Sequence, residues 1–146
     1  MKYSIDITIN RPINEVIETF KNPDEMKNWM KGLVSFEPLD DNFGNPGSKS
    51  LLVFQSGKRK LKMMETVLVN NLPHEFTASY KAKNVFNIVG NSFEEIGPEK
   101  TKYITNQEFK FTGLMKIAYF FMKPAFKKQS YKFLHDFKEY VEKNKK

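Results

Sequence analysis

The final segment of the chain, Leu114 to Lys143, most strongly constrains the fold. A continuous apolar run, Ile117–Met122, leads to Pro124, and from Phe126 onward apolar residues recur at helical spacing with lysines on the opposite face. A proline inside a helix removes one hydrogen bond of the ladder, so we expect a kink at Pro124. A strand-rich chain that ends in one long aromatic helix is typical of a curved sheet that grips the helix. The half before Pro124 should then cover a pocket or its mouth.

The rest of the chain shows the period-two alternation of half-buried strands, separated by turn signals. In Lys2–Ile9, the odd positions are apolar and the even positions are polar. The predicted strands are Lys2–Ile9, Leu33–Leu39, Ser48–Gln55, Leu61–Val69, His74–Ala82, Val85–Ile96 and Thr101–Phe111. Because most of the spacers between them are short, consecutive strands should pair in antiparallel fashion.

Two short helices are predicted between the first and second strands. Pro12 begins the first helix, at a position where its missing N–H costs little. Asn22 can cap the second helix, with Pro23 at its first position and Glu25 three residues after the cap, a variant of the capping box. Gly32 provides the stop signal. The predicted class is therefore α+β.

Length and composition indicate one domain, 1–146, with a frayed tail over 143–146. The chain has no cysteine, which excludes disulfides, thiolate zinc sites and cysteine nucleophiles. The first ten residues lack the apolar core of a secretion signal, and no apolar run reaches the roughly 18 residues of a membrane span. We expect a cytoplasmic protein.

The net charge of +7 comes from 24 Lys and Arg residues against 17 Asp and Glu residues. Much of the excess lies in the stretch Lys58–Lys62 and along the last helix and tail. One interpretation is an anionic partner, such as nucleic acid or a membrane surface. The other is a solvated hairpin tip and a solvated helix face. We favour the second, with no nucleic-acid partner, no stable membrane insertion and at most a transient contact with a membrane surface.

The order of elements and several short motifs resemble the START-like (SRPBCC) superfamily of helix-grip proteins. This superfamily includes polyketide cyclases, lipid-transfer proteins and birch-pollen-allergen-type plant proteins. The motifs are Ile7-x-Ile9-x-x-Pro12-x-x-x-Val16 with Phe20, Asn22-Pro23-x-x-Met26-x-x-Trp29, Pro46-Gly47-Ser48, Met63-x-Glu65-x-Val67, Leu72-Pro73 and Phe109-x-Phe111-x-Gly113. The resemblance implies a helix-grip fold, in which a curved seven-stranded antiparallel sheet, with two short helices after the first strand, holds a long kinked C-terminal helix. It also implies a hydrophobic cavity between the sheet and this helix.

Alternation along the strands predicts which side chains face that cavity. Odd positions are placed inward on the strand Leu61–Val69 and on the last strand, Thr101–Phe111; Val85, Asn87, Val89 and Phe93 are placed inward on the strand before it. The predicted ligand-binding residues are Trp29, Met63, Glu65, Phe76, Tyr80, Asn87, Tyr103, Thr105, Gln107, Phe109, Tyr119, Met122 and Phe126.

Glu65 is the most specific candidate for chemistry. A carboxyl group turned into an apolar cavity would have a raised pKa and could act as a general acid or base. The alternatives are a strand glutamate bonded to backbone, to Gln107 or to Asn87, or one that faces water at a sheet edge. Two isolated histidines, no HExxH pattern and no cysteine predict no metal site, and no cofactor motif is present.

Three functions therefore remain open. The leading hypothesis is binding or transport of a hydrophobic small molecule, such as a lipid, isoprenoid or polycyclic aromatic. The second is a polyketide-cyclase-like or dehydratase-like enzyme in which Glu65 shuttles protons. The third is an interaction module like the chaperone-ATPase activators of the same superfamily. The oligomeric state is not predicted.

Overall fold

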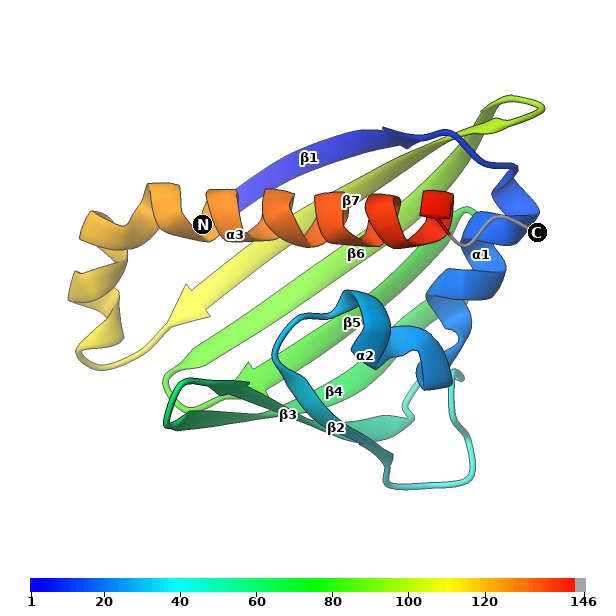
Figure 1. Ribbon diagram of the computed structural model, residues 1–146. Helices are drawn as coiled ribbons and strands as arrows, with labels where there is room; N and C mark the ends of the chain where they lie inside the picture. Colours follow the sequence, from blue (N-terminus) through cyan, green and yellow to red (C-terminus); the bar gives the residue numbers. More distant parts are fainter. Residues whose placement is uncertain (144–146) are drawn as a thin grey trace.

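The computed structural model describes residues 1–143, apart from the side chains of 119–121. One curved antiparallel sheet in the order β1-β7-β6-β5-β4-β3-β2 holds a long helix, α3, against its concave face (Figure 1). The strands are β1 (Lys2–Ile9), β2 (Leu33–Pro38), β3 (Lys49–Ser56), β4 (Arg59–Asn71), β5 (Glu75–Ala82), β6 (Val85–Gly97) and β7 (Lys100–Phe111). The helices are α1 (Ile13–Lys21), the 3₁₀ turn η1 (Pro23–Glu25), α2 (Met26–Trp29) and α3 (Met115–Lys143).

All seven predicted strands are present, and each pairs with its neighbour in antiparallel fashion, which confirms the predicted fold class. The largest boundary difference is at β4, which begins at Arg59 instead of Leu61. Gly57 has a φ of +62°, which glycine adopts without steric cost, so the chain reverses within two residues and Ser56 pairs directly with Arg59. The strands therefore extend to the tip of the hairpin.

The predicted cap at Asn22 is confirmed, although the turn that it caps is a 3₁₀ turn. The Asn22 side-chain oxygen accepts a hydrogen bond from the Asp24 N–H at 3.0 Å. Asn22 also donates from Nδ2 to Glu25 Oε2 at 3.2 Å, a side-chain contact in place of the backbone bond of a capping box. Pro12 precedes α1 and is not its first residue, since its ψ of 148° is extended.

Helix α3 runs across the concave face and contacts β1, β7, α1 and α2. Pro124 lies inside it, and Figure 1 shows that its first turns, in yellow and orange, run at a steep angle to the rest. The expected kink is therefore present, as the missing N–H of proline requires. Lys143, predicted to begin a frayed tail, is the last helical residue; 144–146 lie outside the described residues. Within residues 1–143, no helix is long and apolar enough to span a membrane, and a cytoplasmic location stays a prediction.

The second part of α3 forms the core together with α1, α2 and the adjacent end of the sheet. Phe137 is fully buried and meets Phe20, Trp29 and Tyr103 edge to face, with ring centroids 4.7 to 6.1 Å apart. Edge-to-face contacts of this kind add to the free energy gained by burying the rings. This end of the interior is therefore filled by aromatic side chains.

The first part of α3 differs from the prediction. A nearly continuous apolar segment should be covered almost all round or should line an apolar space, yet Leu114 is 84% exposed, Ile117 63% and Met122 46%. The bend at the start of α3 carries these residues away from the sheet, so the core does not reach them (Figure 1). Leu114, Ile117 and Met122 therefore do not form a roof over the sheet.

Candidate functional site

A band of polar side chains crosses the concave face of the sheet at mid-height. Strand register places Glu65 of β4 opposite Tyr80 of β5, Tyr80 opposite Asn87 of β6, and Asn87 opposite Phe109 of β7. In the next row, Val89 lies opposite Gln107. Because directly paired residues share a face of a sheet, the predicted inward set lies on one surface. Polar groups from four strands therefore converge on the face that α3 crosses.

Glu65 and Tyr80 form the best-defined polar pair in this band. The Tyr80 hydroxyl donates to Glu65 Oε2 at 2.8 Å, and Glu65 is only 6% exposed. Burial raises the pKa of Glu65, and the hydrogen bond from Tyr80 opposes that rise only in part. Burial, followed by the nearby Glu65 carboxylate, raises the pKa of Tyr80 well above its ordinary value. Tyr80 is therefore held as a donor beside a carboxyl group that is easily protonated.

Asn87, Gln107 and Thr105 form a second hydrogen-bonded group. Asn87 Nδ2 donates to Gln107 Oε1 at 3.3 Å, and Gln107 Nε2 donates to Thr105 Oγ1 at 3.0 Å. Asn87 Oδ1 is buried, yet no donor in the described part of the chain reaches it. A buried acceptor without a partner is costly and uncommon in proteins. It marks a place where a donor from another molecule would be stabilised.

Asn91, which the sequence analysis did not select, joins the inward set. Tyr103 donates to Asn91 Oδ1 at 2.7 Å, and Asn91 Nδ2 donates to the Phe76 carbonyl at 3.2 Å. Burial raises the pKa of Tyr103, so its hydroxyl remains a donor. Asn91 occupies the same alternate set of β6 positions as Asn87 and Val89, a signal that could have identified it. These contacts make Tyr103 and Asn91 structural, since both are buried and satisfied.

Two aromatic groups border the polar band. On the side of α1, Phe76 packs edge to face on Phe20 within the filled core. On the other side, Phe126 of α3 lies 5.3 Å from the rings of both Phe109 and Phe111. The predicted residues Phe109 and Phe126 thus pack against each other between the sheet and the helix.

Two predicted binding residues, Trp29 and Met122, stand apart from the band. Trp29 was expected at a pocket mouth but is 2% exposed and packs on Phe133 and Phe137, so it belongs to the core. Met122 was expected in a roof but faces solvent. The side chain of Tyr119 lies outside the described residues. Met63 sits beside Leu52 on the concave face, next to Glu65 in alternation, and remains partly exposed.

The concave face remains accessible in the middle of the sheet. Tyr80, Asn87, Val89 and Gln107 are partly exposed, although they lie on strands away from both sheet edges. The two hollows of defined volume lie elsewhere: about 250 Å³ between α1 and the Leu72-Pro73 turn, and a wide groove of about 850 Å³ along α3 from Pro124 to His135. The predicted site residues line neither hollow. The site is therefore the band itself, beneath α3.

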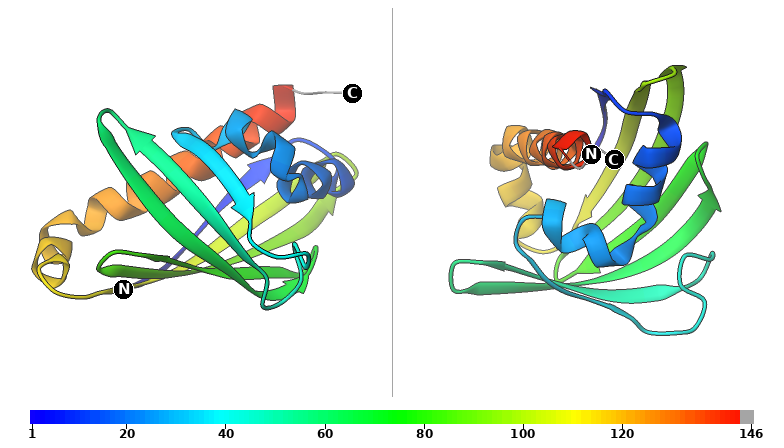
Figure 2. Two further views of the ribbon diagram at one scale, coloured as in Figure 1. Left: turned by 90° about the horizontal axis from the view of Figure 1, so that it is seen from below. Right: turned by 45° about the vertical axis from the view of Figure 1, so that its right-hand side comes forward.

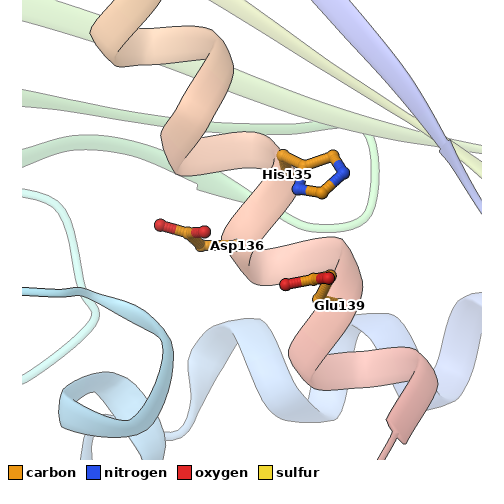
Figure 3. Close-up of side chains that lie close together, drawn as sticks. All are labelled: His135, Asp136 and Glu139. Carbon is orange, nitrogen blue, oxygen red and sulfur yellow. The ribbon is translucent and has the colours of Figure 1, made fainter.

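His135, Asp136 and Glu139 form a separate cluster on α3 (Figure 3). Their potential ligand atoms lie within 4.8 Å of one another. His135 and Glu139 are exposed, and the Asp136 carboxylate already pairs with Lys132 at 2.9 Å and Lys31 at 3.6 Å. A metal ion would compete with both lysines in open solvent, so this arrangement is a surface ion-pair cluster.

No known family model and no curated protein sequence matches this chain, but many solved structures share its fold. The Zhui aromatase/cyclase from Streptomyces sp. R1128 aligns with a TM-score of 0.81 and 12% identity over 97% of this chain and 93% of that protein. Ara h 8.0201 aligns with 0.74 and 11% over 99% of both chains. Norcoclaurine synthase from Thalictrum flavum, in complex with dopamine and hydroxybenzaldehyde, aligns with 0.71 and 11% over 100% of this chain and 88% of that one. The chain therefore has the same helix-grip fold as these proteins.

Proposed function

We propose that this chain binds a hydrophobic small molecule that carries at least one hydrogen-bond donor. The ligand would lie on the concave face beneath α3. The Phe109–Phe126 pair would border it at one end, and the aromatic core would border it at the other. Apolar burial supplies about 25 cal/mol per Å² of buried surface, and polar groups set the orientation. Two proteins of this fold support a ligand of this class. One is an aromatase/cyclase, and the other is a norcoclaurine synthase in complex with dopamine and hydroxybenzaldehyde.

The observation that carries the proposal is the unpartnered Asn87 Oδ1 beside the Glu65–Tyr80 pair. A face meant only for packing would be apolar, or its polar groups would all be paired. Here one buried acceptor lacks a donor, and one carboxyl group has a raised pKa. A ligand hydroxyl or amine placed between Asn87 and Glu65 would form hydrogen bonds with both Asn87 Oδ1 and the Glu65 carboxyl group. Lipids with a hydroxyl head, isoprenoid alcohols and hydroxylated polycyclic aromatics fit this description.

The experiment combines mass spectrometry of co-purifying molecules with thermal shifts across a panel of matched ligands. Each pair in the panel differs only by a hydroxyl group, and a ligand at 100 times its dissociation constant should stabilise the fold by about 2.7 kcal/mol. Val89→Trp should block the concave face and abolish the shift. Its matched control is Ile88→Trp, one residue away and on the opposite face of β6, which should retain the shift. Equal shifts in the two variants, or no preference for hydroxylated ligands, would contradict the proposal.

A second candidate is an enzyme in which Glu65 transfers protons on the bound ligand. Its support is the buried carboxyl group with a raised pKa next to a tyrosine donor. Mass spectrometry of each bound ligand, before and after incubation, would reveal a cyclised or dehydrated product. Glu65→Gln should abolish product formation while ligand binding persists. Recovery of every bound ligand unchanged would contradict the enzyme hypothesis and leave ligand binding as the function.

A further inference from the structure

The sheet topology brings three separated segments to one end of the molecule. These are the β3–β4 hairpin, the β5–β6 turn and the segment that leads from β7 into α3. The register requires this, since Ser56 pairs with Arg59, Ala82 with Val85, and Val85 with Phe111. Both views in Figure 2 show the green hairpins and the yellow start of α3 at the same end. We refer to this region as the basic end.

The basic end carries a large excess of positive charge. The chain contains no Asp or Glu over residues 54–64, 80–86 or 109–128, the stretches that supply this end. Its basic residues, all exposed, are Lys58, Arg59, Lys60, Lys62, Lys81, Lys83, Lys110, Lys116, Lys123, Lys127 and Lys128. Among the described residues, the Lys2–Glu108 salt bridge lies at this end, and further salt bridges involve Lys21, Lys31, Lys132 and Lys138.

The opposite end of the molecule is acidic. It consists of α1, the loop between β2 and β3, and the β4–β5 and β6–β7 turns. Its exposed acidic residues are Glu18, Asp40, Asp41, Glu75, Glu94, Glu95 and Glu99. Positive charge is therefore concentrated at one end of the sheet and negative charge at the other. The sequence predicts the lysines as separate solvated faces, because no local pattern indicates that the hairpin and the start of α3 lie at the same end of the sheet.

Large apolar side chains project among these lysines. Leu114 is 84% exposed, Ile117 63%, Leu61 47% and Met122 46%. Exposed apolar residues such as Leu39 and Ile96 also occur toward the opposite end, at 47% and 50%, so Leu114 and Ile117 are distinguished by their greater exposure. The kinked start of α3 presents Leu114 and Ile117 farthest from the core.

We propose that the basic end binds the surface of an anionic lipid membrane. Lysines around the rim meet the headgroups, and Leu114 and Ile117 enter the boundary between headgroups and acyl chains. A membrane surface combines negative charge with an adjacent apolar layer, which matches both features. A nucleic acid would satisfy the lysines but would leave exposed aliphatic side chains unused. The inference is independent of which molecule the concave face binds.

Sedimentation of the full chain with phosphatidylcholine vesicles, with and without phosphatidylserine, tests this proposal. Binding is expected only when phosphatidylserine is present, and it should fall as salt shortens the Debye length from about 10 Å at 0.1 M to about 3 Å at 1 M. Each lysine near an anionic surface contributes about a fivefold change in partitioning. The triple variant Lys58→Gln/Lys60→Gln/Lys62→Gln should therefore bind about a hundredfold more weakly.

A control variant that loses the same charge elsewhere distinguishes attraction by the basic end from attraction by the net charge of the protein. The triple variant Lys49→Gln/Lys100→Gln/Lys102→Gln removes the same charge from the acidic end and should bind within about twofold of the original. Ile117→Ser should weaken binding about tenfold without changing the thermal unfolding midpoint, because this residue lies outside the core. Equal binding to neutral vesicles, or equal loss in the two triple variants, would overturn the proposal. Binding to a labelled oligonucleotide but not to anionic vesicles would also overturn it.

Discussion

Removal of the Tyr80 hydroxyl tests the central polar pair of the concave face. The hydroxyl donates to Glu65 Oε2 at 2.8 Å, and the carboxyl group is 6% exposed, so water cannot fully replace the lost donor. A hydrogen bond to a charged group contributes about 1.5–3 kcal/mol to stability, and one between neutral groups about 0.5–1.5 kcal/mol. Tyr80→Phe should therefore lower the free energy of unfolding by about 1.5–3 kcal/mol when Glu65 is ionised.

The same substitution should cost less when Glu65 is neutral. In a Glu65→Gln background, Tyr80→Phe removes only a bond to an amide oxygen, so a double-mutant cycle should show a coupling of about 1 kcal/mol. Urea unfolding of the four proteins provides the measurement. An equal cost of Tyr80→Phe in both backgrounds would refute the reasoning, because the hydroxyl would then not act on the carboxylate.

The pH dependence of Glu65 has a definite sign. At low pH the carboxyl group is protonated in both states, and its burial costs little. As pH rises above the ordinary value of 4.5, the unfolded state ionises first, so the protein loses stability until pH passes the raised pKa of the folded state. The loss is about 1.4 kcal/mol for each unit by which the pKa is raised. Glu65→Gln should remove this loss, so its advantage over the original chain grows between about pH 4 and pH 8. An advantage that stays constant or shrinks over this range would show that the folded pKa is not raised.

Three further substitutions test the core and the helix anchor by urea unfolding. Phe137→Ala empties the centre of the aromatic core, where the side chain is fully buried, and should cost about 3–5 kcal/mol; a cost below about 1 kcal/mol would contradict that packing. Tyr103→Phe leaves Asn91 Oδ1 without its donor and should cost about 1–3 kcal/mol, whereas no change would indicate that another donor takes its place. Glu142→Gln weakens the bond from the Asn10 N–H at 2.7 Å and should cost about 1 kcal/mol at neutral pH. Burial alone would raise the pKa of Glu142, but its hydrogen bonds and nearby positive charges lower it, so that cost should vanish as pH falls through the lowered pKa.

The inward faces of the strands could be predicted because alternation is a local property of the chain. Glu65, Tyr80, Asn87 and Gln107 all lie on the concave face, where alternation along each strand placed them. Trp29 and Met122 were misplaced for a different reason. Helical spacing shows which residues share a stripe, but not what the stripe meets after the helix bends. How deeply Trp29 and Met122 are buried depends on packing partners that are distant in sequence.

The sequence by itself determined the class of fold, the antiparallel pairing of consecutive strands from β2 to β7, the cap at Asn22 and the kink at Pro124. Each depends on a few consecutive residues, through alternation, turn chemistry or the missing proline N–H. Only the tertiary structure decided which groups meet across strands. It paired Tyr80 with Glu65, left Asn87 Oδ1 without a donor, and gathered lysines from three separate segments at one end of the sheet. Such contacts depend on the relative placement of whole elements in space, which no local pattern specifies.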